Sequence, residues 1–318
     1  MIRWVVLCVM GIVIGAPNAY ALTCANKPAG ASTLATVQFN TSDGEGQLWE
    51  IYPGAGQIQS PSGAVGTASA SILSAGASTG GQQTIYPKPG SQQPLTNMYV
   101  CFRWKMNSQF VGIRTANKLV FVAAQDFTYG RAGNNAFFGV KPVDTSNYPS
   151  SAMPMFMYWG HNSGNLDNSH TCALDLGLQC NPNVTRTSLY PDTWYEVEIY
   201  ALASSTLTAR NGIVRWWIDG TLNGNYTNVN YGDSIINQFQ INHTWDASAA
   251  IQCYNATTNP LGRDCANPQI HYFDELLIAS AGGVVPPSPS APPPPPPLPL
   301  DTPAGAPATP TGFTHAGP

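Results

Sequence analysis

Apolar and polar residues alternate in short runs along this chain, and Gly, Asn, Pro and Ser separate the runs. Alternation with a period of two indicates β-strands, and no window shows the 3.6-residue spacing of an amphipathic helix. Segment 52–97 is rich in Gly, Ser and Gln, which predicts long loops. We predict strands at residues 35–39, 98–106, 118–125, 136–143, 153–159, 194–202, 213–219, 236–245 and 270–280. Many strands without helices in about 260 residues predict one all-β sandwich or barrel.

The two ends of the chain differ from this middle part. Arg3, the apolar run Trp4–Ile14 and the small-x-small motif Ala19-Tyr20-Ala21 predict a secretory signal peptide. A lipoprotein signal ending at Cys24 is the alternative, although Thr23 is large for the position before such a cysteine. Proline at high density near the C-terminus predicts an extended, disordered tail or linker. We therefore expect a signal peptide at 1–21, one folded domain at 22–282 and a proline-rich tail at 283–318, in a protein that is periplasmic or extracellular.

Cysteine usage agrees with export. Seven cysteines include Cys8 of the signal peptide, and the even number that remains favours disulfides in an exported chain. No CxxC or His-rich spacing indicates zinc. Two pairs are close in the sequence, Cys172 with Cys180 and Cys253 with Cys265. They leave Cys24 to pair with Cys101.

The composition limits the classes of molecule that we expect the protein to bind. Charged residues make up 9% of the chain, the net charge is −4, and no basic stripe is present, which argues against nucleic acid. Few charges with abundant Asn, Gln, Tyr and Trp suit a protein that meets polymers through hydrogen bonds and ring stacking. We expect a polysaccharide partner, no membrane span, a monomer, and attachment to a cell surface through the proline-rich tail.

Three stretches resemble the concanavalin A-like lectin/glucanase superfamily, and their pattern is most similar to its jelly-roll polysaccharide lyases. The first is WYEVEI at 194–199, followed by a turn at 210–212 and by VRWWIDG at 214–220. The others are FQINHTW at 239–245 and the closing strand HYFDELLI at 271–278. The resemblance implies a two-sheet antiparallel jelly-roll β-sandwich. It does not select the chemistry, because this fold carries hydrolases, lyases and lectins.

Hydrolysis would need a pair of carboxylates, and Glu196 with Glu198 is the only near match to the motif of retaining glucanases. In those enzymes the catalytic strand precedes the WYEVEI-type hairpin, and the corresponding stretch here, 153–162, contains no carboxylate. We therefore predict that Glu196, Glu198 and Arg215 form cross-strand charges on the solvent face of a hairpin.

Elimination at a uronic acid needs a base and groups that neutralise the substrate carboxylate. Tyr158 or His161 is the predicted base and acid, and no cofactor is needed for this chemistry. The alternative to a binding role for Arg103 and Lys105 is a position on the convex solvent face. The alternative to a catalytic role for Tyr158 is a position in the core beside Trp159. The predicted substrate-binding residues are Arg103, Lys105, Lys141, Gln240 and Asn242.

A structural calcium is also predicted from similar jelly rolls, in which it joins an N-terminal segment to an aspartate of the last strand. Asp274 and the oxygen-rich stretch 40–45 are the matching ligands here. The predicted function is that of a secreted lyase cleaving a uronate-containing polysaccharide by β-elimination. The alternatives are a non-catalytic carbohydrate-binding or adhesive module on a proline-rich stalk, and a purely structural surface protein.

Overall fold

The computed structural model describes the chain in several separate stretches, all of which belong to the first of two units, Met1–Val284 and Val285–Pro318. In these stretches the structure has strands and no helix, so none of them contains a helix that could cross a membrane. The described residues are 22–39, 50–51, 58–59, 68–73, 79–86, 95–108, 110, 117–123, 135–143, 154–161, 179–206, 208–231, 235–245 and 269–281.

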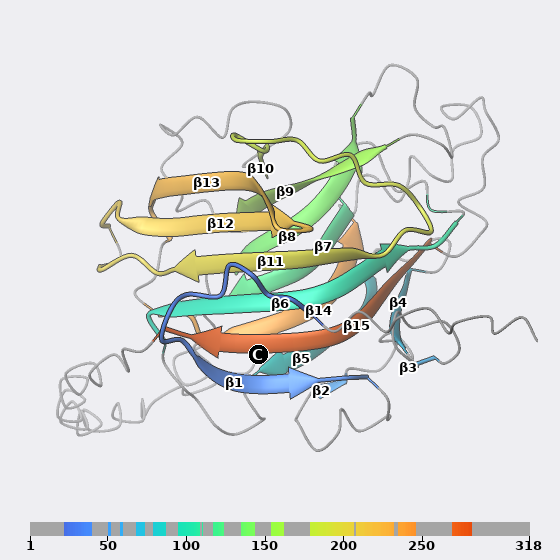
Figure 1. The fold of residues 1–318 in the computed structure, drawn as a ribbon, viewed down its shortest axis with the longest axis horizontal. Coiled ribbons are helices and arrows are strands. Elements are labelled where there is room, and N and C mark those ends of the chain that lie inside the picture. The colour runs from blue at the N-terminus through green and yellow to red at the C-terminus, as the bar shows by residue number, and fades with distance from the viewer. Residues whose placement is uncertain are drawn as a thin grey trace, which may run out of the picture. The chain divides into compact units, whose positions relative to one another are not determined.

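The strands form two antiparallel sheets (Figure 1). Sheet A has eight strands, and β1 pairs with β15 beside the main path. In spatial order sheet A contains β13 (Thr221–Val229), β12 (Gly212–Ile218), β11 (Tyr195–Leu202), β6 (Asn97–Met106), β15 (Gln269–Ser280), β4 (Ala68–Leu73) and β3 (Ile58–Gln59), with β1 (Ser32–Val37) next to β15.

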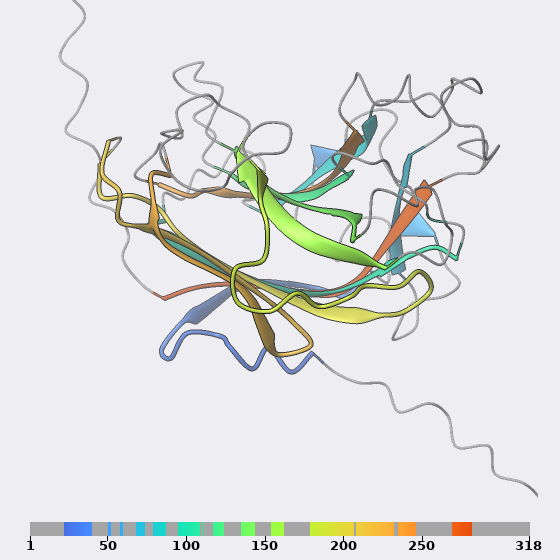
Figure 2. The same ribbon diagram turned by 90° about the horizontal axis from the view of Figure 1, so that it is seen from above.

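Sheet B has seven strands and forms the second layer, which is visible in the view of Figure 2. In spatial order it contains β10 (Gln179–Cys180), β9 (Met155–His161), β8 (Asn135–Pro142), β7 (Asn117–Ala123), β14 (Gln238–Trp245), β5 (Thr79–Tyr86) and β2 (Glu50–Ile51). Two packed antiparallel sheets confirm the predicted β-sandwich.

The core lies between the sheets, where aromatic side chains from both layers meet. Phe102 of β6 packs against Phe239 of β14 with ring centroids 6.0 Å apart, and Phe138 of β8 meets Trp216 of β12 at 6.0 Å. All four rings are almost completely buried, and each such ring stabilises the fold by roughly 2 kcal/mol. These rings share the inner faces of the two sheets because successive side chains of a strand point to opposite sides.

The hairpin of the predicted family pattern is present. Strands β11 and β12 pair antiparallel, and β12 turns into β13 through Asp219 and Gly220. Both turn residues have positive φ, 48° and 72°, which is the type I′ geometry that suits two-residue hairpins. No predicted strand covers β13. The prediction of long loops at 52–97 was wrong where β3, β4 and β5 lie.

Candidate functional site

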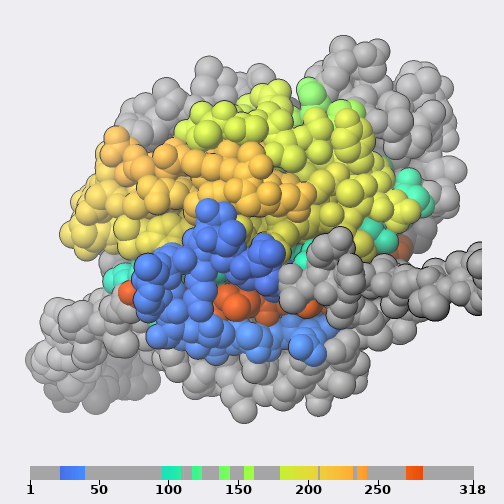
Figure 3. All heavy atoms as spheres, in the orientation of Figure 1, coloured from blue at the N-terminus to red at the C-terminus, as the bar shows by residue number. Residues whose placement is uncertain are grey.

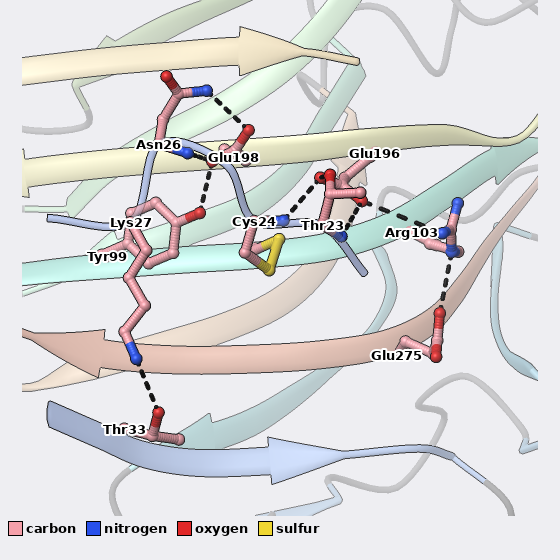
Figure 4. Close-up of a disulfide and its surroundings, with 11 residues drawn as sticks. Thr23, Cys24, Asn26, Lys27, Thr33, Tyr99, Arg103, Glu196, Glu198 and Glu275 are labelled. Carbon is pink, nitrogen blue, oxygen red and sulfur yellow. Dashed lines mark hydrogen bonds and ion pairs between the residues drawn. A yellow bond between two sulfur atoms is a disulfide. The ribbon is translucent and has the colours of Figure 1, made fainter. Parts of the chain in front are cut away.

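The glutamate pair of β11 lies on the outer face of sheet A, beneath residues 22–31, which we call the N-terminal strap (Figures 3 and 4). Glu196 and Glu198 are 6% and 0% exposed, so the prediction of a solvent face was wrong. Glu196 accepts hydrogen bonds from the backbone N–H groups of Thr23 and Cys24 at 2.8 and 2.9 Å. Glu198 accepts two from Asn26, at 2.8 and 2.9 Å. These carboxylates therefore anchor the strap.

A disulfide also holds the strap, and a buried tyrosine holds Glu198. Cys24 forms the predicted disulfide with Cys101 of β6, with a Cα–Cα distance of 5.8 Å. Tyr99 donates its hydroxyl hydrogen to Glu198, and burial together with this bond raises the pKa of Tyr99 far above the usual value for tyrosine. Cys180 is also disulfide-bonded, to a cysteine outside the described residues.

Arg103 and Lys105 also belong to sheet A. Arg103 Nε lies 2.9 Å from Glu275, and its Nη2 lies 4.0 Å from Glu196. Lys105 Nζ lies 3.1 Å from Asp192 and sits between two rings, 5.3 Å from Trp194 and 5.2 Å from Tyr272. Arg215, the predicted partner of the glutamates, instead donates to Asn225 at 2.7 Å. The structure thus places Arg103 and Lys105 in the other sheet from the predicted catalytic residues Tyr158 and His161 and from the other predicted substrate-binding residues.

Sheet B presents a second group of aromatic residues on the face that points away from the core. Phe121, Phe137, Phe156 and Tyr158 form a cluster of their own, separate from the main core. Phe121 and Phe137 are cross-strand neighbours with ring centroids 5.8 Å apart, and Phe137 meets Tyr158 edge-on at 6.0 Å. The odd–even alternation of β7, β8 and β9 places these rings on one face.

Three cations lie over these rings, and we call this surface the cation–aromatic face. Lys118 Nζ is 4.8 Å from the centroid of Phe137. Lys141 Nζ is 5.4 Å from Phe156 and 5.4 Å from Tyr158, and the Arg186 guanidinium is 4.6 Å from Phe156. Cations at such distances are attracted by the negative face of an aromatic ring, by about 0.5–2 kcal/mol each. The rings therefore hold positive charge in place on sheet B.

Strand register puts Tyr158 beside a glycine. Tyr158 pairs with Gly139 of β8, and a Cβ at Gly139 would lie 2.8 Å from the Tyr158 hydroxyl. Tyr158, which is 0% exposed, thus fills the space beside Gly139. On the other side of the face, Gln240 pairs with Phe121 and donates its side-chain amide to Gln238. These amides extend the polar part of the cation–aromatic face.

The structure describes the surroundings of three predicted site residues only in part. His161 ends β9, paired with Ala136, and Asn242 lies in β14, paired with Gln82; both side chains lie outside the described residues. Asp274 is fully buried and accepts the backbone N–H of Glu275 at 2.9 Å. Its predicted calcium partners at 40–45 lie outside the described residues, so the calcium site stays a prediction.

The described charged side chains are held differently on the two sheets. Each ion pair that joins two described residues includes Arg103 or Lys105 of β6 in sheet A. The described side chains of the cation–aromatic face include three cations and no carboxylate. Sequence reasoning missed Lys118 and Arg186: alternation could have found Lys118, whereas no local pattern marks Arg186, which lies in a connection.

Comparison with known proteins gives the fold. No protein-family model and no curated protein matches the sequence. Among solved structures, the alginate lyase Aly36B matches with a TM-score of 0.52 and 13% identity over 78% of this chain and 96% of that one. The chain has the concanavalin A-like jelly-roll fold.

Two further solved structures are similar. An alginate lyase, vAL-1 from Chlorella virus, has a TM-score of 0.49 and 11% identity over 78% of this chain and 100% of that one. An endo-β-1,4-glucuronan lyase from the fungus Trichoderma reesei has a TM-score of 0.44 and 12% identity over 78% and 96%.

Proposed function

We propose that this jelly roll is an exported polysaccharide lyase that cleaves a uronate-containing polymer by β-elimination. The observation that carries the proposal is the cation–aromatic face, where Lys118, Lys141 and Arg186 lie over a cluster of rings. A repeating polyanion complements such a surface, because its carboxylates meet cations that the aromatic rings hold in place. The fold shared with the alginate lyase Aly36B supports the same proposal.

The chemistry assigned to these residues follows from what elimination requires. The base takes the C5 proton of the uronate, and the electron pair of that C–H bond forms the C4–C5 double bond. The C4–O bond breaks, its electron pair stays on the oxygen of the leaving sugar, and that oxygen takes up a proton. Negative charge develops on the substrate carboxylate as the proton leaves, and a cation held beside it stabilises that charge. Lys141 is assigned this role, and the neighbouring Tyr158 is assigned the proton transfer. The Gln238 and Gln240 amides are assigned to sugar hydroxyls.

A second function is favoured by one observation. Tyr158 is 0% exposed, whereas a group that takes a proton from a substrate must contact it. The same face without a reachable base would bind an acidic polysaccharide and leave it intact. A carbohydrate-binding module is therefore the alternative.

The decisive experiment follows the ultraviolet absorbance of the unsaturated uronate formed by elimination. Purified protein is incubated with alginate, glucuronan and a neutral glucan. We expect absorbance to rise on a polyuronate only, and Tyr158→Phe, which keeps the ring, to abolish the rise. Tyr200→Phe, on sheet A, is the matched control and should leave it unchanged. If absorbance rises on no polyuronate although the protein binds one, the lyase is excluded and the carbohydrate-binding module remains.

A further inference from the structure

A row of three side chains crosses the outer face of sheet A near the end of β6, away from the cation–aromatic face. Tyr272 of β15 is the direct cross-strand neighbour of Lys105. On the other side of β6, Tyr195 pairs with the core residue Trp104, and this register places Trp194 opposite Lys105. Directly opposed residues share one face of a sheet. The two rings therefore flank the Lys105 ammonium, with their centroids 5.3 Å (Trp194) and 5.2 Å (Tyr272) from its Nζ. We call Trp194, Lys105 and Tyr272 the outer aromatic row.

Asp192 adds an exposed carboxylate to this row. Its Oδ1 lies 3.1 Å from Lys105 Nζ, and the side chain of Asp192 is 65% exposed, whereas that of Lys105 is 11% exposed. Burial and the nearby Asp192 charge raise the pKa of Tyr272. The N-terminal strap is anchored elsewhere on this face, at Glu196 and Glu198. The more exposed charged group at the row is therefore the Asp192 carboxylate.

The backbone holds Asp192 in this position. Asp192 has a φ of 59°, in the left-handed region, which a residue with a side chain adopts at an energetic cost. Its N–H donates to the Met106 carbonyl at 2.8 Å, and the nearby Tyr190 N–H donates to the Tyr195 hydroxyl at 2.7 Å. The carboxylate is thus preorganised, and a ligand that binds it loses little affinity to ordering it.

This combination suits a neutral sugar residue. The C–H face of a sugar ring packs on an aromatic ring, and Trp194 and Tyr272 are only partly buried. A sugar hydroxyl donates to a carboxylate oxygen in a charge-assisted hydrogen bond, which is stronger than a bond between neutral groups. The acid group of a uronate would instead meet the negative charge of Asp192 at short range. The row therefore favours neutral sugars, in contrast to the preference proposed for the cation–aromatic face.

We propose that Asp192, Trp194 and Tyr272 form a second carbohydrate-binding site, which takes a neutral sugar residue of a polysaccharide on the outer face of sheet A. The site goes beyond the proposed function, because it lies on the other sheet and involves no cleavage. The two proposals therefore fail independently. A protein with both sites would hold a neutral polysaccharide with one sheet and act on an acidic one with the other.

The test measures binding of neutral oligosaccharides of glucose, mannose and xylose by calorimetry, with an oligouronate and an oligomer of glucosamine as comparison ligands. We expect at least one neutral oligosaccharide to bind, with an affinity that does not depend on salt, because the ligand carries no charge to be screened. Trp194→Ala should weaken this binding about tenfold through loss of the ring. Asp192→Asn should weaken it about threefold, because asparagine keeps an acceptor and tolerates positive φ but loses the charge.

Trp217→Ala is the matched control, because Trp217 is another partly buried tryptophan on the outer face of sheet A, next to the core residue Trp216. It should leave neutral-sugar binding unchanged, and Trp194→Ala should leave oligouronate binding unchanged. Circular dichroism checks that each variant is folded, and Asp192→Asn carries the test alone if Trp194→Ala is not.

No binding of any neutral oligosaccharide overturns the site, and so does neutral-sugar binding that the folded Trp194 and Asp192 variants leave intact. Tighter binding of the glucosamine oligomer, abolished by Asp192→Asn, overturns the neutral-sugar assignment, because the ligand would then be a cation. Either result leaves the proposed function standing, since that function is tested by absorbance on polyuronates.

Discussion

Replacing Arg103 by Gln tests whether the cations of sheet A serve the fold or the ligand. Arg103 lies between Glu275 at 2.9 Å and Glu196 at 4.0 Å, and its side chain is 12% exposed. Removing one partner of a buried ion pair costs about 3–5 kcal/mol. The cost here is smaller, because Glu196 keeps its hydrogen bonds from Thr23 and Cys24 and the Glu275 side chain remains 18% exposed. We expect a loss of about 2 kcal/mol in the free energy of unfolding.

The assay is urea unfolding followed by fluorescence, with oligouronate binding measured on the same samples. For a domain of this size a loss of about 2 kcal/mol lowers Tm by roughly 4–8 °C. In a double-mutant cycle, Arg103→Gln and Glu275→Gln should cost less together than the sum of their separate costs. Binding should be unchanged at temperatures where the variant is folded. Lost binding with unchanged stability would refute the reasoning, because Arg103 would then be a ligand-binding residue.

Three further outcomes follow from single contacts. Replacing Cys24 and Cys101 by Ser removes a disulfide between residues 77 apart in the sequence. The chain-entropy model gives a loss of up to about 4.5 kcal/mol in the free energy of unfolding, to be measured in urea. An unchanged urea midpoint would contradict a structural role for the strap. The pKa of Tyr99 is raised by burial and by its bond to Glu198, so the stability it contributes is full below about pH 10 and declines above it. Urea midpoints measured between about pH 8 and pH 11 should fall, and fall less in Tyr99→Phe. Gly139→Ala brings a methyl group against Tyr158 and the Asn117 carbonyl and should cost about 1–3 kcal/mol in thermal unfolding, whereas a neutral effect would mean that the ring moves freely.

Strands with a strongly apolar face could be predicted from the sequence, whereas β4, β5 and β13 could not. In β6 the apolar residues Val100, Phe102 and Trp104 occupy every second position, and they are buried. β13 is an edge strand with a mostly polar sequence, TLNGNYTNV, and its burial does not alternate, because the neighbouring residues Asn223 and Gly224 are both buried. Its position comes from the Asp219-Gly220 turn and from pairing with β12, which are tertiary facts rather than a periodic signal.

The candidate site was predictable only where its residues share a strand face. Lys141 and Tyr158 could be proposed because each lies in a predicted strand, and the two share the face that points away from the core. Arg186 could not, because it reaches the rings through a connection that Asn223 holds from a distant strand. Glu198 was misplaced for the same reason: its partner Asn26 is 172 residues away. Long-range contacts of this kind leave no trace in a local pattern.

The glutamate pair and the cation–aromatic face together explain how one alternating pattern produces two different surfaces. The outer face of sheet A is covered by the N-terminal strap, so its carboxylates are satisfied by backbone amides of the same chain. A face whose charges are neutralised internally has little affinity left for a charged polymer. On sheet B the described cations lie over aromatic rings, which hold them in place without cancelling their charge. The described charges are therefore held in two ways: on sheet A by ion pairs and by backbone amides of the N-terminal strap, and on sheet B by aromatic rings.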